Sequence, residues 1–227
     1  MITTIIFDLD GTLMNTLDDL HSSVCFALRQ VGLPENDKLD TRRFLGNAVR
    51  NLIWRSVEKA NPSADDETKE VVLNIFRKHY LEHSMDRTAP YEGIMEMLAE
   101  CKRMRFNTAI VSNKLDAAVK DLHQHFFADC IDLAIGESES VRRKPAPDMV
   151  NEAIHQIALR QGRIINLEEC VYVGDSEVDL ATAQNSGLPC IAVSWGFRDK
   201  DLLVEQGAKV IIDSPMDLFS AIQSLGK

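Results

Sequence analysis

The sequence lacks the features that mark disulfide-bonded, membrane-spanning and nucleic-acid-binding proteins. Its five cysteines are scattered without a Cys-x-x-Cys pair, which argues against disulfides or zinc and favours free thiols in a reducing cytoplasm. No apolar run approaches the ~20 residues of a membrane span, and no basic segment with a following apolar stretch indicates a signal peptide. Acidic residues outnumber basic ones by 35 to 25, and this excess argues against nucleic acids or anionic membranes as partners.

The composition is otherwise that of an ordinary globular protein. The chain has 227 residues, of which 45% are hydrophobic and 26% charged. This length suits one substantial domain with a smaller one attached. With a net charge of −10, the protein needs a local cluster of cations or a metal to attract an anionic substrate.

Apolar runs typical of buried strands alternate with segments of helical periodicity over most of the chain. After the run at residues 5–7, the predicted strands cover 107–111, 131–135, 170–173, 190–193 and 210–212. The predicted helices cover 93–104, 116–127, 148–161, 178–185 and 216–225. This alternation predicts an α/β fold with a doubly wound parallel sheet and right-handed crossovers.

Residues 15–85 interrupt this alternation, because apolar residues recur there at helical spacing and no strand is evident. A break at residues 61–63 predicts a new helix that starts at Ser63 or Asp65. Residues 88–91 are typical of a hinge that returns to the sheet. We therefore expect a core domain of residues 1–14 and 86–227, with a small all-helical cap domain of residues 15–85 inserted after the first strand.

Two carboxylates follow the first apolar run directly. Asp8 and Asp10 would lie at the carboxyl end of a buried strand, where open α/β sheets bind ligands. Gly11 allows a sharp turn there, and Thr12 adds a hydroxyl group. Carboxylates this close repel each other unless a cation intervenes, and Mg²⁺ is the expected one. The pair could also supply a nucleophile and a general acid for phosphoryl transfer, although a short motif of this kind also occurs in plain polar loops.

Three later segments add polar groups at the ends of other predicted strands. Ser112 and Asn113 could donate hydrogen bonds to phosphate oxygens, or could simply cap a helix. Lys144 precedes a proline, which favours an extended backbone and a fixed positive charge for a phosphoryl group, although the basic segment 142–144 also suits a solvated loop. Asp175 and Asp179 offer one direct metal ligand and one partner that acts through water or through another ligand.

Together these segments resemble the motifs of the haloacid dehalogenase superfamily. The matching residues are Asp8-Leu9-Asp10-Gly11-Thr12, Ser112-Asn113, Lys144-Pro145 and Gly174-Asp175 with Asp179. The resemblance covers the whole chain, since one branch of the family carries a helical cap where this chain has its insert. It implies a Rossmann-like core, with Asp8 as the nucleophile and Asp10 as the general acid and base.

The resemblance also implies the remaining site residues. Phosphate would be bound by Thr12, Ser112, Asn113 and Lys144, and Mg²⁺ by Asp8, Asp10, Asp175 and Asp179. The Asp10 ligand would be its backbone carbonyl. The expected substrate is a small phosphorylated metabolite, and the expected state is a monomer or a homodimer.

Differences within the motifs narrow the expected reaction to phosphate hydrolysis. The dehalogenases that name the family lack the second aspartate, so Asp10 argues against halide displacement. Phosphosugar mutases of the β-phosphoglucomutase kind tend to carry glutamate at the position of Gly174 and often valine at that of Thr12. A mutase and a pyrophosphatase on the same fold remain as alternatives. A non-catalytic Mg²⁺-binding protein would have no use for Asp8 and Asp10 together.

The cap resembles that of phosphoglycolate phosphatases over residues 42–52. It departs from their pattern at Ala48, where a second glycine is usual. Arg43 and Arg50 could each form a forked ion pair with a substrate carboxylate, or could be exposed helix residues. Together with Gly46, they are the candidate substrate-binding residues of the cap.

Overall fold

The computed structural model describes residues 1–46, 48–139 and 141–225. Asn47, which belongs to the segment that resembles the phosphoglycolate phosphatase cap, lies outside the described residues. The chain divides into two compact units, one of Met1–Leu13 with Pro90–Lys227 and one of Met14–Ala89. The domain boundaries expected from the sequence, at residues 14–15 and 85–86, lie close to this division. No helix in the described ranges is both long and apolar enough to cross a membrane.

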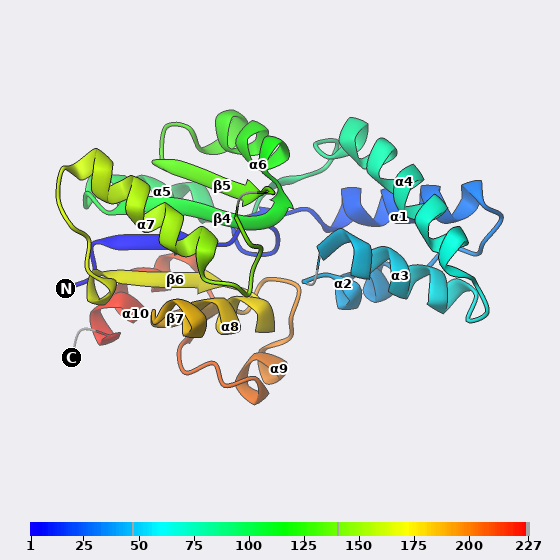
Figure 1. Cartoon of the computed structure of the whole chain (residues 1–227). Helices are drawn as coiled ribbons and strands as arrows, with labels where there is room; N and C mark the ends of the chain where they lie inside the picture. The colour runs from blue at the N-terminus through cyan, green and yellow to red at the C-terminus, as the bar shows by residue number, and fades with distance from the viewer. Residues whose placement is uncertain (47, 140, 226–227) are drawn as a thin grey trace. The chain divides into compact units, whose positions relative to one another are not determined.

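Within the described residues, six parallel strands form the core sheet in the order β5-β4-β1-β6-β7-β8 (Figure 1). The strands are β1 (Thr4–Phe7), β4 (Asn107–Leu115), β5 (Leu133–Glu137), β6 (Cys170–Gly174), β7 (Cys190–Val193) and β8 (Ile211–Ile212). All four residues of β1 are buried, as a central strand covered on both faces requires. The predicted parallel α/β sheet is confirmed.

Helices cover both faces of this sheet, with α7 and α8 in front of it and α5 behind it in Figure 1. The helices of the core are α5 (Ile94–Arg103), α6 (Asp116–Leu122), α7 (Asp148–Gln161), α8 (Glu177–Ser186), α9 (Lys200–Glu205) and α10 (Leu218–Leu225). The helix predicted over 116–127 divides into α6 and a π-helical turn at His123–Phe127. One part of the hydrophobic core joins α7 to β1, β4, β5 and β6, through residues such as Ile6, Val111, Ile135 and Ile154.

The inserted unit contains the helices α1 (Leu17–Gln30), α2 (Lys38–Phe44), α3 (Ala48–Ala60) and α4 (Asp66–His83). Asp65 caps α4, because its carboxylate accepts a hydrogen bond from the Thr68 N–H at 2.8 Å. The buried carboxylate of Asp19 accepts hydrogen bonds from the backbone N–H groups of Arg87 and Thr88, which fixes the end of the unit. A short sheet of β2 (Met14–Asn15) and β3 (Ala89–Pro90) joins the two connecting segments; the sequence pattern did not reveal it.

Candidate active site

The predicted catalytic side chains of the core lie at the carboxyl-terminal edge of neighbouring strands. Asp8 directly follows β1, and Asp175 directly follows β6, which pairs with β1 in parallel. Ser112 lies in the second half of β4, which pairs with β1 on its other side. The strand order therefore brings together groups that are far apart in the sequence, at the edge where open α/β sheets bind their ligands.

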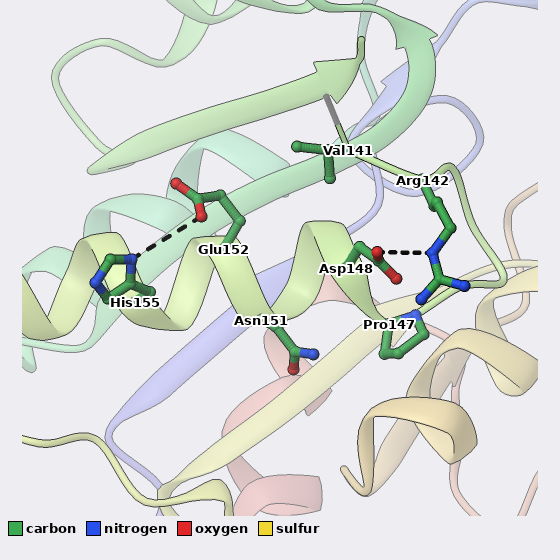
Figure 2. A pocket seen from close by; sticks show the side chains of 7 residues that line it. All are labelled: Val141, Arg142, Pro147, Asp148, Asn151, Glu152 and His155. Carbon is green, nitrogen blue, oxygen red and sulfur yellow. Dashed lines mark hydrogen bonds and ion pairs between the residues drawn. The ribbon is translucent and has the colours of Figure 1, made fainter. Parts of the chain in front are cut away.

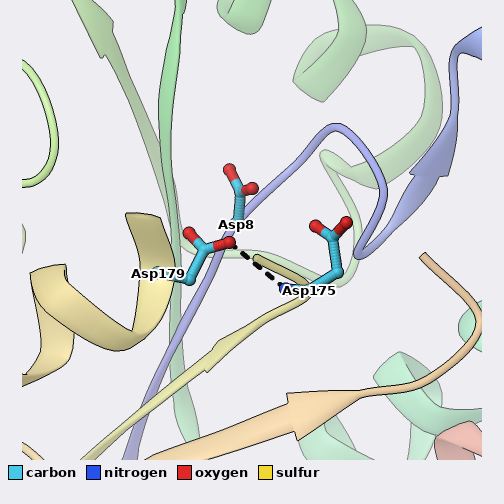
Figure 3. Close-up of side chains that lie close together, drawn as sticks. All are labelled: Asp8, Asp175 and Asp179. Carbon is cyan, nitrogen blue, oxygen red and sulfur yellow. Dashed lines mark hydrogen bonds between the residues drawn. The ribbon is translucent and has the colours of Figure 1, made fainter. Parts of the chain in front are cut away.

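Asp8, Asp175 and Asp179 form a cluster of buried carboxylates (Figure 3). One oxygen atom of each lies within 4.8 Å of those of the other two. Only 7% of Asp8 and 1% each of Asp175 and Asp179 are exposed to solvent. Buried carboxylates at such distances are stable only if protons, cations or hydrogen-bond donors compensate their charges.

Lys144 supplies one positive charge to this carboxylate cluster. Its Nζ atom lies 2.7 Å from Asp8 Oδ1 and 2.8 Å from Asp179 Oδ1. It also donates a hydrogen bond to the Tyr172 hydroxyl at 3.1 Å. An ammonium group has three N–H donors, so these three acceptors satisfy it. Lys144 is therefore held beside the predicted nucleophile by groups of the protein itself.

Tyr172 is a member of this network that the sequence analysis missed. It lies on β6, is fully buried, and donates a hydrogen bond from its hydroxyl to Asp179 Oδ1 at 3.0 Å. A tyrosine within an apolar strand is usually part of the core, so no sequence signal distinguished it. Its hydroxyl gives Asp179 and Lys144 a common neutral partner.

Asp179 is held by donors on both of its oxygen atoms. Lys144 and Tyr172 donate to Oδ1, whereas Oδ2 accepts from the Asp175 N–H, the Ser176 N–H and the Ser176 hydroxyl, the last at 2.6 Å. Ser176 and Asp179 also form the capping box that begins α8. Burial alone would raise the pKa of Asp179, but Lys144 and these hydrogen bonds lower it below its usual value.

The other two carboxylates are less well compensated. Burial, followed by the charge of Asp179, raises the pKa of Asp8 well above its usual value of 3.8. The same two causes raise the pKa of Asp175 to about 7. Burial lowers the pKa of Lys144, but the carboxylates of Asp179 and Asp8 outweigh this effect and raise it. With all three carboxylates ionised, the cluster would hold more negative charge than Lys144 neutralises, and a divalent cation would remove this imbalance.

The carboxylate of Asp175 is oriented from two sides. Oδ1 accepts a hydrogen bond from the Thr12 hydroxyl at 3.1 Å, and Oδ2 accepts one from the Phe197 N–H at 2.7 Å. The loop after β7 approaches so closely that a Cβ atom at Gly196 would lie 2.3 Å from that of Asp175. The Trp195 indole also donates to the Thr12 carbonyl at 3.0 Å. The sequence analysis did not assign this loop to the site.

Asn113 fixes the backbone of Lys144. Its side chain donates to the Lys144 carbonyl at 3.0 Å and accepts from the Lys144 N–H at 2.8 Å. Ser112 is buried, and its hydroxyl accepts from the Lys114 N–H at 3.2 Å. In this structure Thr12, Ser112 and Asn113 thus contact other groups of the protein, and their predicted contacts with phosphate stay predictions.

Asp10 forms an ion pair with Lys114, a residue that the sequence analysis also missed. Lys114 Nζ lies 3.0 Å from Oδ1 and 3.3 Å from Oδ2 of Asp10. The Lys114 side chain is 8% exposed and that of Asp10 is 22% exposed. Lys114 directly follows Asn113 after a predicted strand, and this position is the sequence feature that could have indicated it as a site residue.

The candidate substrate residues of the cap have different surroundings. Arg43 is exposed, whereas Gly46 has a φ of 104°, in the region that favours glycine. The Arg50 guanidinium forms an ion pair with Glu70 and lies 4.2 Å from the centre of the Trp54 ring. A substrate carboxylate would therefore have to compete with Glu70 for Arg50, and the substrate roles of these cap residues stay predictions.

A separate surface pocket of about 440 Å³ lies beside the start of α7 (Figure 2). An ion pair of 2.8 Å between Arg142 and Asp148 lies at one end of it, and His155 lies at the other end (Figure 2). None of the predicted site residues lines this pocket. The carboxylate cluster, rather than this pocket, is therefore the candidate active site.

The chain matches the family model of the haloacid dehalogenase-like hydrolases over residues 5–193. A protein of Mesorhizobium japonicum named phosphoglycolate phosphatase is 31% identical over 91% of this chain and 89% of its own length. A protein of the same name from Vibrio vulnificus is 29% identical over 97% of this chain and 96% of its own length. One similar crystal structure is that of a protein from Lactobacillus delbrueckii subsp. bulgaricus, described provisionally as a phosphoglycolate phosphatase. It is 33% identical, covers 97% of this chain and 98% of its own, and has a TM-score of 0.91.

Proposed function

The chain belongs to the haloacid dehalogenase-like hydrolase family and is a phosphatase, and we propose that it hydrolyses a small acidic phosphomonoester by means of Asp8 and Mg²⁺. The observation that supports this most strongly is the placement of Asp8, which lies 2.7 Å from Lys144 and within one carboxylate cluster with Asp175. Phosphoglycolate is the proposed substrate class, because the relatives that cover nearly the whole chain carry that name.

The donor set suits Mg²⁺. Carboxylate oxygens are hard ligands, and the excess negative charge of the cluster matches a divalent cation. We assign Asp8, Asp175 and the backbone carbonyl of Asp10 as ligands. Asp179 accepts two donors on one oxygen and three on the other, whereas Asp175 accepts one donor on each, so we assign Asp179 to orienting Lys144 and Asp175 rather than to direct ligation. When bound, the cation would shield Asp8 from the negative charge of the phosphate.

The proposed chemistry passes through a phosphorylated Asp8. An oxygen of its carboxylate attacks the phosphorus atom, and the bond from phosphorus to the leaving oxygen breaks as Asp10 donates a proton to that oxygen. Asp10 then accepts a proton from the water molecule that attacks the phosphorylated Asp8, and this step releases phosphate and restores the carboxylate. Lys144 orients Asp8 and stabilises the negative charge of the phosphoryl oxygens.

Lys114 adds a function to this scheme. Its ammonium contacts both oxygens of Asp10 and so fixes the position of the carboxyl group that would carry the proton. Proton transfer requires the donor to lie within hydrogen-bond distance of the leaving oxygen. We therefore assign Lys114 to positioning Asp10.

One observation favours hydrolysis over the mutase alternative. A Cβ atom at Gly174 would lie 2.3 Å from the Cβ atom of Asp179. The glutamate that mutases tend to carry at this position would thus require a different placement of Asp179. A structural relative from Thermotoga maritima described as a β-phosphoglucomutase is 18% identical, and it supports the common fold alone.

A phosphate-release assay over a panel of substrates tests the proposal. The panel contains phosphoglycolate, small sugar phosphates, p-nitrophenyl phosphate and pyrophosphate, each assayed with Mg²⁺ and with EDTA. We expect activity with Mg²⁺, a preference for phosphoglycolate, and loss of activity in EDTA. A preference for pyrophosphate would indicate a pyrophosphatase, and equal activity in EDTA would refute the requirement for metal.

A further inference from the structure

The loop that follows β7 carries an ion pair next to its contact with Asp175. Arg198 Nε lies 2.6 Å from Glu177 Oε2, and a second guanidinium nitrogen lies 2.8 Å from Glu177 Oε1. The Arg198 side chain is only 7% exposed, and that of Glu177 is 31% exposed. Such a forked contact restrains the direction as well as the distance between its partners.

The Glu177–Arg198 pair flanks the hydrogen bond that orients Asp175. Arg198 follows Phe197, whose N–H donates to Asp175 Oδ2 at 2.7 Å, and Glu177 lies two residues after Asp175. The ion pair and the hydrogen bond therefore join the same two segments, the loop after β7 and the segment from Asp175 to the first residue of α8. A displacement of the loop would break both contacts.

We infer that the Glu177–Arg198 pair positions Asp175 for the divalent cation by holding the Phe197 N–H against Asp175 Oδ2. Neither side chain touches the reacting atoms, so both are positioning residues. The inference rests on the proposed function, because that proposal assigns Asp175 as a metal ligand. Groups that orient metal ligands typically contribute ten- to hundredfold to metal affinity.

The test uses the double variant E177Q/R198M. Removal of one partner alone would leave a buried charge without compensation and would threaten folding. The double variant removes both charges and keeps the net charge of the protein. Because Arg198 and Glu177 also interact electrostatically with the carboxylate cluster, the Phe197 amide is measured alongside the metal affinity to report geometry. The matched control is E100Q/R103M, which removes the same residue types from a forked Glu–Arg pair on the surface of α5.

Two measurements on metal-free protein follow the effect. Calorimetric titration with MgCl₂, in the absence of substrate, gives the dissociation constant of the ion. Hydrogen exchange of the Phe197 amide, followed by NMR, reports the hydrogen bond to Asp175 directly. Thermal unfolding of each variant verifies that it is folded at the temperature of the titration.

For E177Q/R198M we expect Mg²⁺ to bind roughly ten- to hundredfold more weakly and the Phe197 amide to exchange faster. The control E100Q/R103M should stay within about twofold of the wild type. If E177Q/R198M binds Mg²⁺ within about twofold of the wild type, the pair is merely structural and the inference is wrong, while the proposed function stands. If the wild type binds no Mg²⁺, the proposed metal dependence fails, and the inference fails with it.

Discussion

Asp175→Asn should stabilise the metal-free protein at neutral pH, although it removes a proposed metal ligand. The asparagine oxygen can accept the Phe197 N–H, and the amide can donate to the Thr12 hydroxyl, so the two hydrogen bonds of Asp175 have replacements. What the substitution removes is the cost of a buried carboxylate that is 1% exposed.

The pKa of Asp175 sets the size and the sign of this effect. Its folded-state pKa of about 7 lies above the ordinary value of 3.8, so the native state binds the proton more tightly than the unfolded state does. Ionisation of Asp175 therefore destabilises the fold as the pH rises from about 4 to about 7, and the cost stays constant above this window. From these two pKa values, ionisation of Asp175 lowers the free energy of unfolding by about 4 kcal/mol at pH 7.5 and by roughly 2 kcal/mol at pH 5.

Urea unfolding in EDTA measures this difference. In a Trp54→Phe background, the fluorescence of Trp195 reports the core alone, since these are the two tryptophans of the chain. We expect Asp175→Asn to be more stable than its parent by up to about 4 kcal/mol at pH 7.5, and by less at pH 5. An equal or lower stability at pH 7.5 would refute the argument.

Mg²⁺ should shrink this gap. At a concentration of one hundred times its dissociation constant, a ligand stabilises the protein that binds it by about 2.7 kcal/mol. The parent should gain this amount, whereas Asp175→Asn should gain little because it lacks a ligand. Equal gains for both proteins would show that Asp175 does not bind the ion.

Four further substitutions test the other roles. Asp8→Asn keeps the shape but removes the nucleophile, so kcat should fall by several orders of magnitude, and retention of more than about a tenth of the wild-type value would rule out the covalent route. Asp10→Asn should reduce the hydrolysis of alkyl phosphates more than that of p-nitrophenyl phosphate, whose leaving group needs little protonation; equal losses would count against Asp10 as the acid. Tyr172→Phe removes one acceptor of Lys144, so kcat should fall by about tenfold while the affinity for Mg²⁺ in calorimetry stays unchanged. A large loss of that affinity would contradict the interpretation that Tyr172 acts by orienting Lys144. Arg50→Ala should raise KM for phosphoglycolate by roughly tenfold but leave KM for p-nitrophenyl phosphate unchanged, and equal effects would assign Arg50 to its contacts within the cap.

The sequence predicted the elements of the core well, because buried parallel strands are short apolar runs and the helices between them have clear periodicity. Helix α7 occupies the predicted range, Asp148–Gln161. The short β2–β3 sheet was missed because two-residue strands are too short to show any pattern. The π-helical turn after α6 was missed because it continues the apolar periodicity of that helix.

The site was predictable where its groups directly follow strands. Asp8 and Asp175 can be recognised in the sequence because each is an acidic residue at the end of an apolar run. The residues that orient them were not predictable in the same way. Phe197 acts through its backbone N–H, which every residue except proline carries, and Tyr172 is hidden in a strand as a core residue. Contacts of this kind depend on how closely segments approach in three dimensions.

The three aspartates of the cluster differ most in how many hydrogen-bond donors of the protein they engage. Asp179 accepts donors on both oxygens and has a lowered pKa, as expected of a group that serves as a fixed structural anion. Asp175 accepts one donor on each oxygen, and Asp8 is paired with Lys144 through Oδ1. Each carboxylate oxygen has lone pairs for further contacts, so the capacity to bind a cation grows from Asp179 to Asp175 to Asp8. The pKa values of Asp175 and Asp8 are raised whereas that of Asp179 is lowered, so the two proposed metal ligands are the carboxylates whose negative charge the protein compensates least.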